Sequence, residues 1–125
     1  MPLTRVHYRY TDAGNYKYDD IVLLYGTVTD AERARLHESL DKGIGMDGNG
    51  FIPQQLGWRH PAAADPHFPS SDDHCWSTLD VNDEETFEEV AEPEPNEVIV
   101  DSVSGWVEAM AHCGRQGWDS ERWAL

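Results

Sequence analysis

The chain has 125 residues, and its 24 Asp and Glu against nine Lys and Arg give a formal net charge of -15 at pH 7. Such a charge repels nucleic-acid phosphates, which argues against direct DNA or RNA binding and favours a protein partner with a basic surface. The length suits one domain with its own core, so we expect residues 1–125 to form a single domain.

The amino-terminal residues predict a β-hairpin. Residues 5–10 alternate between apolar and polar side chains, which is typical of a half-buried strand. Residues 12–15 have turn composition, and residues 16–28 are rich in Tyr, Ile, Val and Leu. Two strands joined by a tight turn follow from this pattern.

A helix is predicted to follow the hairpin. Thr29 and Glu32 have the spacing of a capping box, so the helix should begin at Asp30 and run to about Lys42. Gly43 is expected to end it in the left-handed conformation.

The middle of the chain is predicted to be irregular, with one or two further strands. Residues 43–50 hold four glycines and predict a loop, and residues 58–71 hold three prolines. Residues 75–81 and 98–100 are the candidate strands, the latter at a sheet edge.

Residues 82–97 are the most acidic part of the chain. They hold eight Asp and Glu and two prolines, and we expect a mobile acidic loop there. No Lys or Arg occurs between Arg59 and Arg115. The negative charge is therefore concentrated in one interval of the sequence.

The carboxy-terminal part predicts a second helix over residues 102–113. Its apolar residues recur at i, i+3, i+4 and i+7, namely Val103, Trp106, Val107 and Met110. Asp101 or Ser102 can cap the start and Gly114 the end. Packed on the sheet, this helix completes a small α+β fold.

The segment Asp47–Ile52 is similar to part of an EF-hand calcium loop. Gly45 stands where such a loop has its first carboxylate, and Leu56 where it has its bidentate glutamate. We therefore expect a glycine-rich loop and no calcium site.

A metal site is the second chemical hypothesis. The candidate ligands lie seven residues apart or adjacent, and they are His60, His67, His74 and Cys75. The short spacings usual in zinc sites are absent. An alternative function is therefore a small metal-binding protein or metal-dependent enzyme that uses the His, Cys and Asp residues of 60–75.

Nucleophilic catalysis is the third hypothesis. Asp72, Asp73, His74 and Cys75 have the residue types of an activated thiol. However, acidic neighbours raise the pKa of a cysteine and oppose the thiolate. Phosphate loops, dinucleotide fingerprints and serine elbows are absent, so we expect neither an enzyme nor a cofactor.

The cellular compartment is predicted from cysteine content and hydropathy. Cys75 and Cys113 are too few for the disulfide framework of a small secreted domain. Residues 1–10 lack the apolar run of a signal peptide, and no stretch is long and apolar enough to span a membrane. We expect a cytoplasmic protein with two free thiols and no membrane association.

Three segments in this order resemble small bacterial proteins usually described as hypothetical. They are Tyr10–Tyr18 with Asp-Ala-Gly-Asn-Tyr-Lys, Phe51–Gly57 with Phe-Ile-Pro-Gln-Gln, and Asp72–Trp76 with Asp-Asp-His. The resemblance implies a bacterial or phage origin and one compact domain, and it carries no activity and no catalytic residue.

The leading functional prediction is an acidic protein–protein interaction module, an accessory or inhibitory subunit of a larger bacterial or phage assembly. The candidate contact residues are aromatic or acidic, namely Tyr16, Tyr18, Trp58, Trp76, Glu84, Glu85, Glu88 and Glu89. A second alternative is a nucleic-acid mimic whose carboxylates occupy the basic groove of a nucleic-acid-binding protein.

Overall fold

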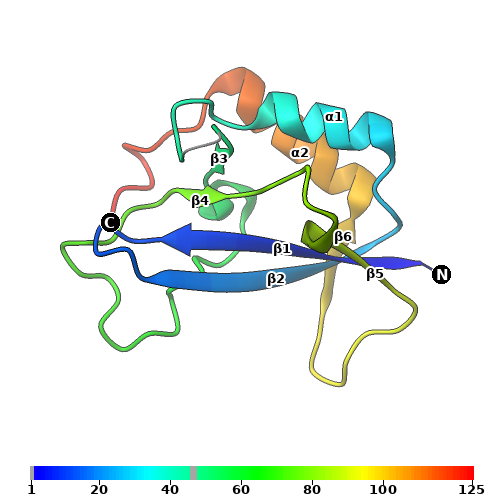
Figure 1. Ribbon diagram of the computed structural model, residues 1–125, viewed down its shortest axis with the longest axis horizontal. Helices are drawn as coiled ribbons and strands as arrows, with labels where there is room; N and C mark the ends of the chain where they lie inside the picture. Colours follow the sequence, from blue (N-terminus) through cyan, green and yellow to red (C-terminus); the bar gives the residue numbers. More distant parts are fainter. Residues whose placement is uncertain (1, 46–47) are drawn as a thin grey trace.

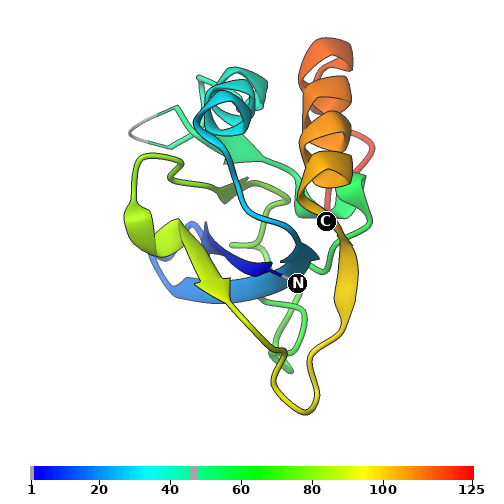
Figure 2. The same cartoon turned by 90° about the vertical axis from the view of Figure 1, so that its right-hand side faces the viewer.

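The computed structural model describes residues 2–45 and 48–125 as one α+β domain, as predicted. A mixed sheet of six strands carries two helices on one face, and the apolar core lies between them (Figures 1 and 2). Three irregular excursions, around residues 60–75, 79–86 and 91–98, leave the sheet and return to it.

The predicted hairpin consists of β1 (Leu3–Thr11) and β2 (Lys17–Tyr25), which pair in continuous antiparallel register. The Gly26 amide donates to the Pro2 carbonyl at 2.8 Å, and the Asp12 amide to the Tyr16 carbonyl at 3.0 Å. These two bonds place the even-numbered pairs in the hydrogen-bonded positions of the ladder. The odd-numbered residues therefore direct their backbone groups away from the hairpin.

The remaining strands are short and join the two edges of the hairpin. On the β1 side lie β4 (Ser77–Thr78), which also pairs with β3 (Gly50–Phe51), and β5 (Phe87–Val90). On the β2 side lies β6 (Ile99–Ser102), which runs parallel to β2. An edge strand was predicted here over residues 98–100, and the observed strand begins one residue later and ends two residues later.

Helix α1 (Asp30–Ser39) begins with the predicted capping box, because Thr29 Oγ1 accepts from the Glu32 amide and the Glu32 side chain returns to the Thr29 amide. Its end was predicted wrongly. Leu40 turns into the core, and residue Asp41 forms a β-bridge with Gly50, so the backbone cannot continue as a helix to Gly43.

Helix α2 (Val103–Gln116) buries the predicted apolar stripe, and Ser102 caps it by accepting from the Gly105 amide at 3.0 Å. It continues past Gly114 and ends at Gly117, whose φ is 95°. A Cβ on Gly114 would lie 2.9 Å from Ser39 Cα, so glycine is needed there for the helices to approach. Trp118 packs back on the core and donates to the Ser39 carbonyl at 2.8 Å, as expected for the tail.

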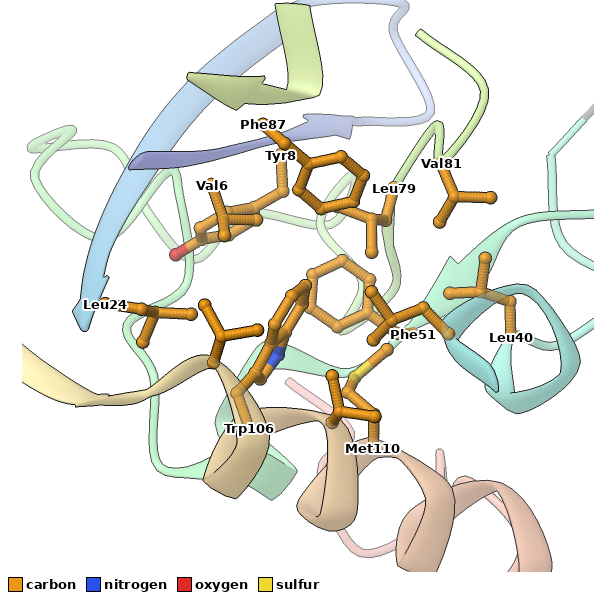
Figure 3. Close-up of a cluster of buried hydrophobic side chains, with 13 residues drawn as sticks. Val6, Tyr8, Leu24, Leu40, Phe51, Leu79, Val81, Phe87, Trp106 and Met110 are labelled. Atoms are coloured by element: carbon orange, nitrogen blue, oxygen red, sulfur yellow. The ribbon is translucent and has the colours of Figure 1, made fainter. Parts of the chain in front are cut away.

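The core joins both helices to the sheet. Figure 3 shows Trp106 extending from α2 toward Phe51, with Leu24 and Val6 of the hairpin on one side and Leu40, the residue that follows α1, on the other. Two 3₁₀ helices, η1 (Pro53–Leu56) and η2 (Glu84–Thr86), complete the chain. The core lies on the face of β1 that carries its even-numbered side chains, which leaves the odd-numbered face for surface chemistry.

Candidate functional site

The outer edge of β1 is divided between two strands. β5 pairs with Leu3 to Val6, and β4 pairs only at Arg9. His7 lies between the two pairings, and its odd position directs its backbone amide and carbonyl into the gap. The chain between β4 and β5 loops away from the sheet, so the gap opens into a groove.

The groove has a volume of about 760 Å³ and receives side chains from β1, β2, β4 and η2. Its lining residues are mostly polar and acidic, namely His7, Tyr8, Arg9, Asp19, Asn49, Thr78, Asp80, Asp83, Glu84, Glu85, Thr86 and Glu88. We call this the acidic groove.

Most carboxylates of the acidic groove are not neutralised by a neighbouring cation. Arg9 Nε pairs with Asp19 at 2.7 Å, which lowers the pKa of that carboxyl, and His7 Nε2 lies 3.0 Å from Glu88. Asp80, Asp83, Glu84 and Glu85 form no ion pair within residues 2–45 and 48–125. These four charges face solvent.

Arg33 of α1 holds the backbone that carries these carboxylates. Its Nη1 donates to the Val81 carbonyl at 2.6 Å, and its guanidinium lies over the Phe87 ring, 5.0 Å from the centroid. Val81 and Phe87 are both buried. Asp83 Oδ1 caps the next turn by accepting from the Glu85 amide at 2.9 Å. The acidic side chains therefore project from an anchored segment.

The prediction of a loop over residues 82–97 is wrong for residues 84–90, because these residues form η2 and β5. Alternation along β5 puts the Phe87 ring in the core, and this burial favours a strand despite the surrounding charge. Glu88 lies opposite Arg5, and Glu89 lies opposite Thr4 on the other face of the sheet. Glu89 is therefore not part of the acidic groove.

The second half of the acidic segment is tied to β1 by Arg5. Its Nε and Nη2 donate to the two carboxylate oxygens of Glu97 at 2.8 and 2.6 Å. This bidentate hydrogen bond lowers the pKa of Glu97 to about 2. Glu97 also accepts from the Glu94 amide at 2.7 Å, so residues 94–97 form a closed turn on the sheet.

The candidate metal ligands are not arranged as a metal site. His60 and His74 flank the Tyr10 ring, with ring centroids 4.3 and 4.8 Å from it. Both nitrogens of each imidazole are bonded to the backbone, at Ala62 and His74 for His60 and at Thr11 and Trp76 for His74. His67 is exposed on the excursion. Within the described ranges, no group of three or more His, Cys, Asp or Glu could hold a metal ion.

The candidate catalytic thiol lacks an activating base. Cys75 is buried, and burial raises the pKa of its thiol. His74 is the adjacent residue, but its ring is occupied by the Thr11 carbonyl and the Trp76 amide. Asp73 accepts instead from the Tyr10 hydroxyl at 2.7 Å. Cys75 and Cys113 are both free and buried, as expected for structural thiols.

The calcium-like segment has a structural role in the part that is described. Asp47 lies outside the described residues. Gly48 has a φ of 64°, and a Cβ there would lie 2.8 Å from the Lys42 carbonyl oxygen. Phe51 and Ile52 follow as fully buried core residues. The glycines therefore form the expected loop that leads into β3.

The four aromatic contact candidates differ in exposure and in their contacts. Tyr16 is exposed at the hairpin turn. The Tyr18 hydroxyl donates to Asp65 at 2.8 Å, which raises the pKa of Tyr18 to about 12. Trp58 stacks on Trp106 at 5.6 Å against the core, and Trp76 is half-buried.

Comparison with known proteins identifies no relative of this chain. No family model, curated protein or solved structure matches the chain. None of the helices in the described ranges is both long enough and apolar enough to cross a bilayer.

The sequence predicted three acidic residues of the groove, Glu84, Glu85 and Glu88, but missed its three aspartates and the arginines that order the acidic chain. Arg33 and Arg5 act over 48 and 92 residues of sequence, a separation that local periodicity cannot detect. The one available signal was that Phe87 stands alone as an aromatic residue in an acidic run. Such a residue needs a buried environment, which in turn needs an ordered backbone.

Proposed function

We propose that this protein is an acidic interaction module that binds a basic surface of another protein through the acidic groove. We place it in the cytoplasm, as an accessory or inhibitory subunit of a larger bacterial or phage assembly. The observation that carries the proposal is the set of four unpaired carboxylates on a segment anchored by Arg33. Fixed charges of one sign speed the encounter with an oppositely charged partner and orient it.

Anchoring is the reason that this groove is favoured over the rest of the acidic surface. A carboxylate on an ordered backbone loses less conformational entropy on binding than one on a mobile tail. The fold already supplies that order through Val81, Asp83 and Phe87. Glu88 and Asp19 add two further charges, which basic groups of a ligand could share. Arg5 and His7 now contact Glu88, and Arg9 contacts Asp19.

The test is co-purification from the native host, followed by affinity measurement with the recovered partner. A triple variant, Glu84→Gln with Glu85→Gln and Glu88→Gln, should weaken binding roughly 3- to 150-fold, since each of the three lost ion pairs at an interface rim contributes about 0.2–1 kcal/mol. The matched control is Glu38→Gln with Glu92→Gln and Glu121→Gln. Both triples remove three charges and change the formal net charge from -15 to -12.

An equal loss of affinity in the two triple variants would mean that binding depends only on net charge and would refute a specific role of the acidic groove. A wild-type protein that retains no host protein at any salt concentration would refute the module itself.

The nucleic-acid mimic is kept as the second candidate, because η2 and β5 hold their carboxylates in ordered structure, which a mimic requires. Its discriminating measurement is competition. If the recovered partner binds DNA or RNA, a mimic and that nucleic acid compete for one site. The fraction of mimic displaced then equals the fraction of the partner that is occupied by nucleic acid. A module that docks elsewhere stays bound in a ternary complex.

A further inference from the structure

The edge of β2 is open beside β6. β6 pairs with β2 only from Leu23 to Tyr25, so residues 17–22 have no strand on this side in the described parts of the chain. Ile21 is at an odd position, and its backbone groups therefore point outward from the hairpin. Figure 2 shows β6 as the outermost strand on this side of the molecule.

A second groove, of about 580 Å³, lies along this open edge. One wall is residues 56–59 and the other is residues 96–98 with Val100. The exposed fractions of Ile21, Val98 and Val100 are 45%, 73% and 54%, although all three are large apolar residues. Such a concentration of exposed apolar side chains next to a free strand edge is typical of an interaction surface.

Aspartates cover the edge amides at both ends of this groove. Asp20 Oδ1 accepts from the Ile21 amide at 2.8 Å, and Asp101 Oδ1 accepts from the Ser102 amide at 2.7 Å. Asp20 is also bound by the Arg59 guanidinium at 3.1 Å. A strand that pairs with the Ile21 amide must displace the Asp20 carboxylate, which Arg59 continues to hold, and a Lys or Arg of that strand can share this carboxylate.

The charge of the chain selects the occupant. A second copy of the chain would bring another formal charge of -15 to the edge, and an acidic strand would face Asp20 and Asp101 with charge of the same sign. A strand that alternates basic and apolar residues satisfies both the aspartates and the exposed valines, because alternate side chains point to opposite faces.

We propose that the open edge of β2 binds an extended basic segment of a partner protein by strand addition, with apolar side chains over Ile21, Val98 and Val100 and Lys or Arg toward Asp20 and Asp101. This surface lies on the β2 side of the hairpin, whereas the acidic groove lies on the β1 side. The proposal therefore goes beyond the acidic groove and stands independently of it.

The probe is a fluorescent seven-residue peptide that alternates Lys and Val, with a Lys and Ser peptide of the same charge as its control. Fluorescence anisotropy should give an affinity at least tenfold higher for the Lys and Val peptide. The double variant Val98→Ser with Val100→Ser should reduce that affinity at least fivefold. Both sites are exposed, and an unchanged unfolding midpoint verifies that the variant folds.

Hydrogen exchange supplies the second readout. Bound peptide should slow exchange of the Ile21 amide, which strand addition would protect. The groove variant Glu84→Gln with Glu85→Gln and Glu88→Gln should keep its peptide affinity within threefold, which separates this surface from the acidic groove.

Three results would each overturn the proposal. Equal affinity for the two peptides would reduce the effect to net charge. Unchanged Ile21 exchange would exclude pairing at this edge. Self-association of the wild-type protein that Val98→Ser with Val100→Ser abolishes would identify a second copy as the occupant.

Discussion

His60 and His74 hold the segment of residues 60–75 against β1 through hydrogen bonds at both ring nitrogens. In each ring Nδ1 accepts from a backbone amide two residues ahead, at 3.0 and 3.1 Å. The proton must therefore be on Nε2, which donates to a carbonyl at 2.8 Å in both cases. A second proton on the His60 ring would oppose the Ala62 amide.

This geometry predicts a stability loss in mild acid. Burial lowers the pKa of His60 below its ordinary value of 6.5. Below that value the unfolded chain takes up a proton that the folded protein resists, so the free energy of unfolding is retained above pH 6.5 and falls as the pH decreases toward the folded pKa. Urea unfolding midpoints at pH 7.5 and pH 5 should show this decrease.

His60→Gln should reduce the difference between the urea unfolding midpoints at pH 7.5 and pH 5. At pH 7.5 it should also be about 1–3 kcal/mol less stable, because the Ala62 amide or the His74 carbonyl loses its partner. The control is His67→Gln, since His67 is exposed in the same excursion. The assignment to His60 is wrong if both variants show the same pH dependence as the wild type.

At the scale of elements, α1 stabilises the segment of residues 80–88, which carries the groove carboxylates, through Arg33. Arg33→Met should detach that segment, cost about 1–3 kcal/mol for the buried carbonyl and ring contact, and speed hydrogen exchange in β5. Arg35→Met is the control on the same helix, because it breaks only the exposed pair with Glu108, a pair of a type that contributes about 0–1 kcal/mol.

Exchange rates should separate the two variants. We expect faster exchange in β5 for Arg33→Met and unchanged rates in α2. If Arg35→Met accelerates β5 to the same extent, the segment is held by general helix packing and not by the Arg33 contacts.

Elements with local signals were predictable. The hairpin has alternation and a turn, α1 has the Thr29–Glu32 capping box, and α2 has its apolar stripe capped by Ser102. Each signal depends on residues within a few positions of one another, and the structure confirms all three.

Elements that depend on distant partners were not predictable. β3 and β4 contain two residues each and exist because they pair with one another and with β1. The sequence of β5 predicts a charged loop, whereas in the structure Phe87 contacts Trp106 and Arg33, which are distant in sequence. The division of β1 between β4 and β5, which creates the acidic groove, has no local signal at all.

At the scale of the whole molecule, the charge of -15 should destabilise the folded state through self-repulsion. Increasing NaCl from about 10 to 200 mM shortens the screening length from roughly 30 Å to below 10 Å. The Tm should rise by roughly 2–5 °C, the shift that about 0.5–1 kcal/mol produces in a domain of this size.

Thermal unfolding monitored by circular dichroism provides the measurement. Most of the increase should fall below 200 mM, where screening changes fastest. A Tm that decreases over this range would mean that ion pairs such as Arg5 with Glu97 outweigh the net repulsion.

The central position of β1 has a consequence for synthesis. β1 and β2 are made first, but the strands that complete the other edge of β1 are made only at Ser77–Thr78 and Phe87–Val90. At a translation rate of about 5–20 residues per second, the completed hairpin waits roughly 3–13 s for the end of β5, with Val6 and Tyr8 uncovered. Helix α2, which covers that face, is made later still. An apolar face and an unpaired strand edge that stay exposed for seconds make the nascent chain prone to aggregation during synthesis.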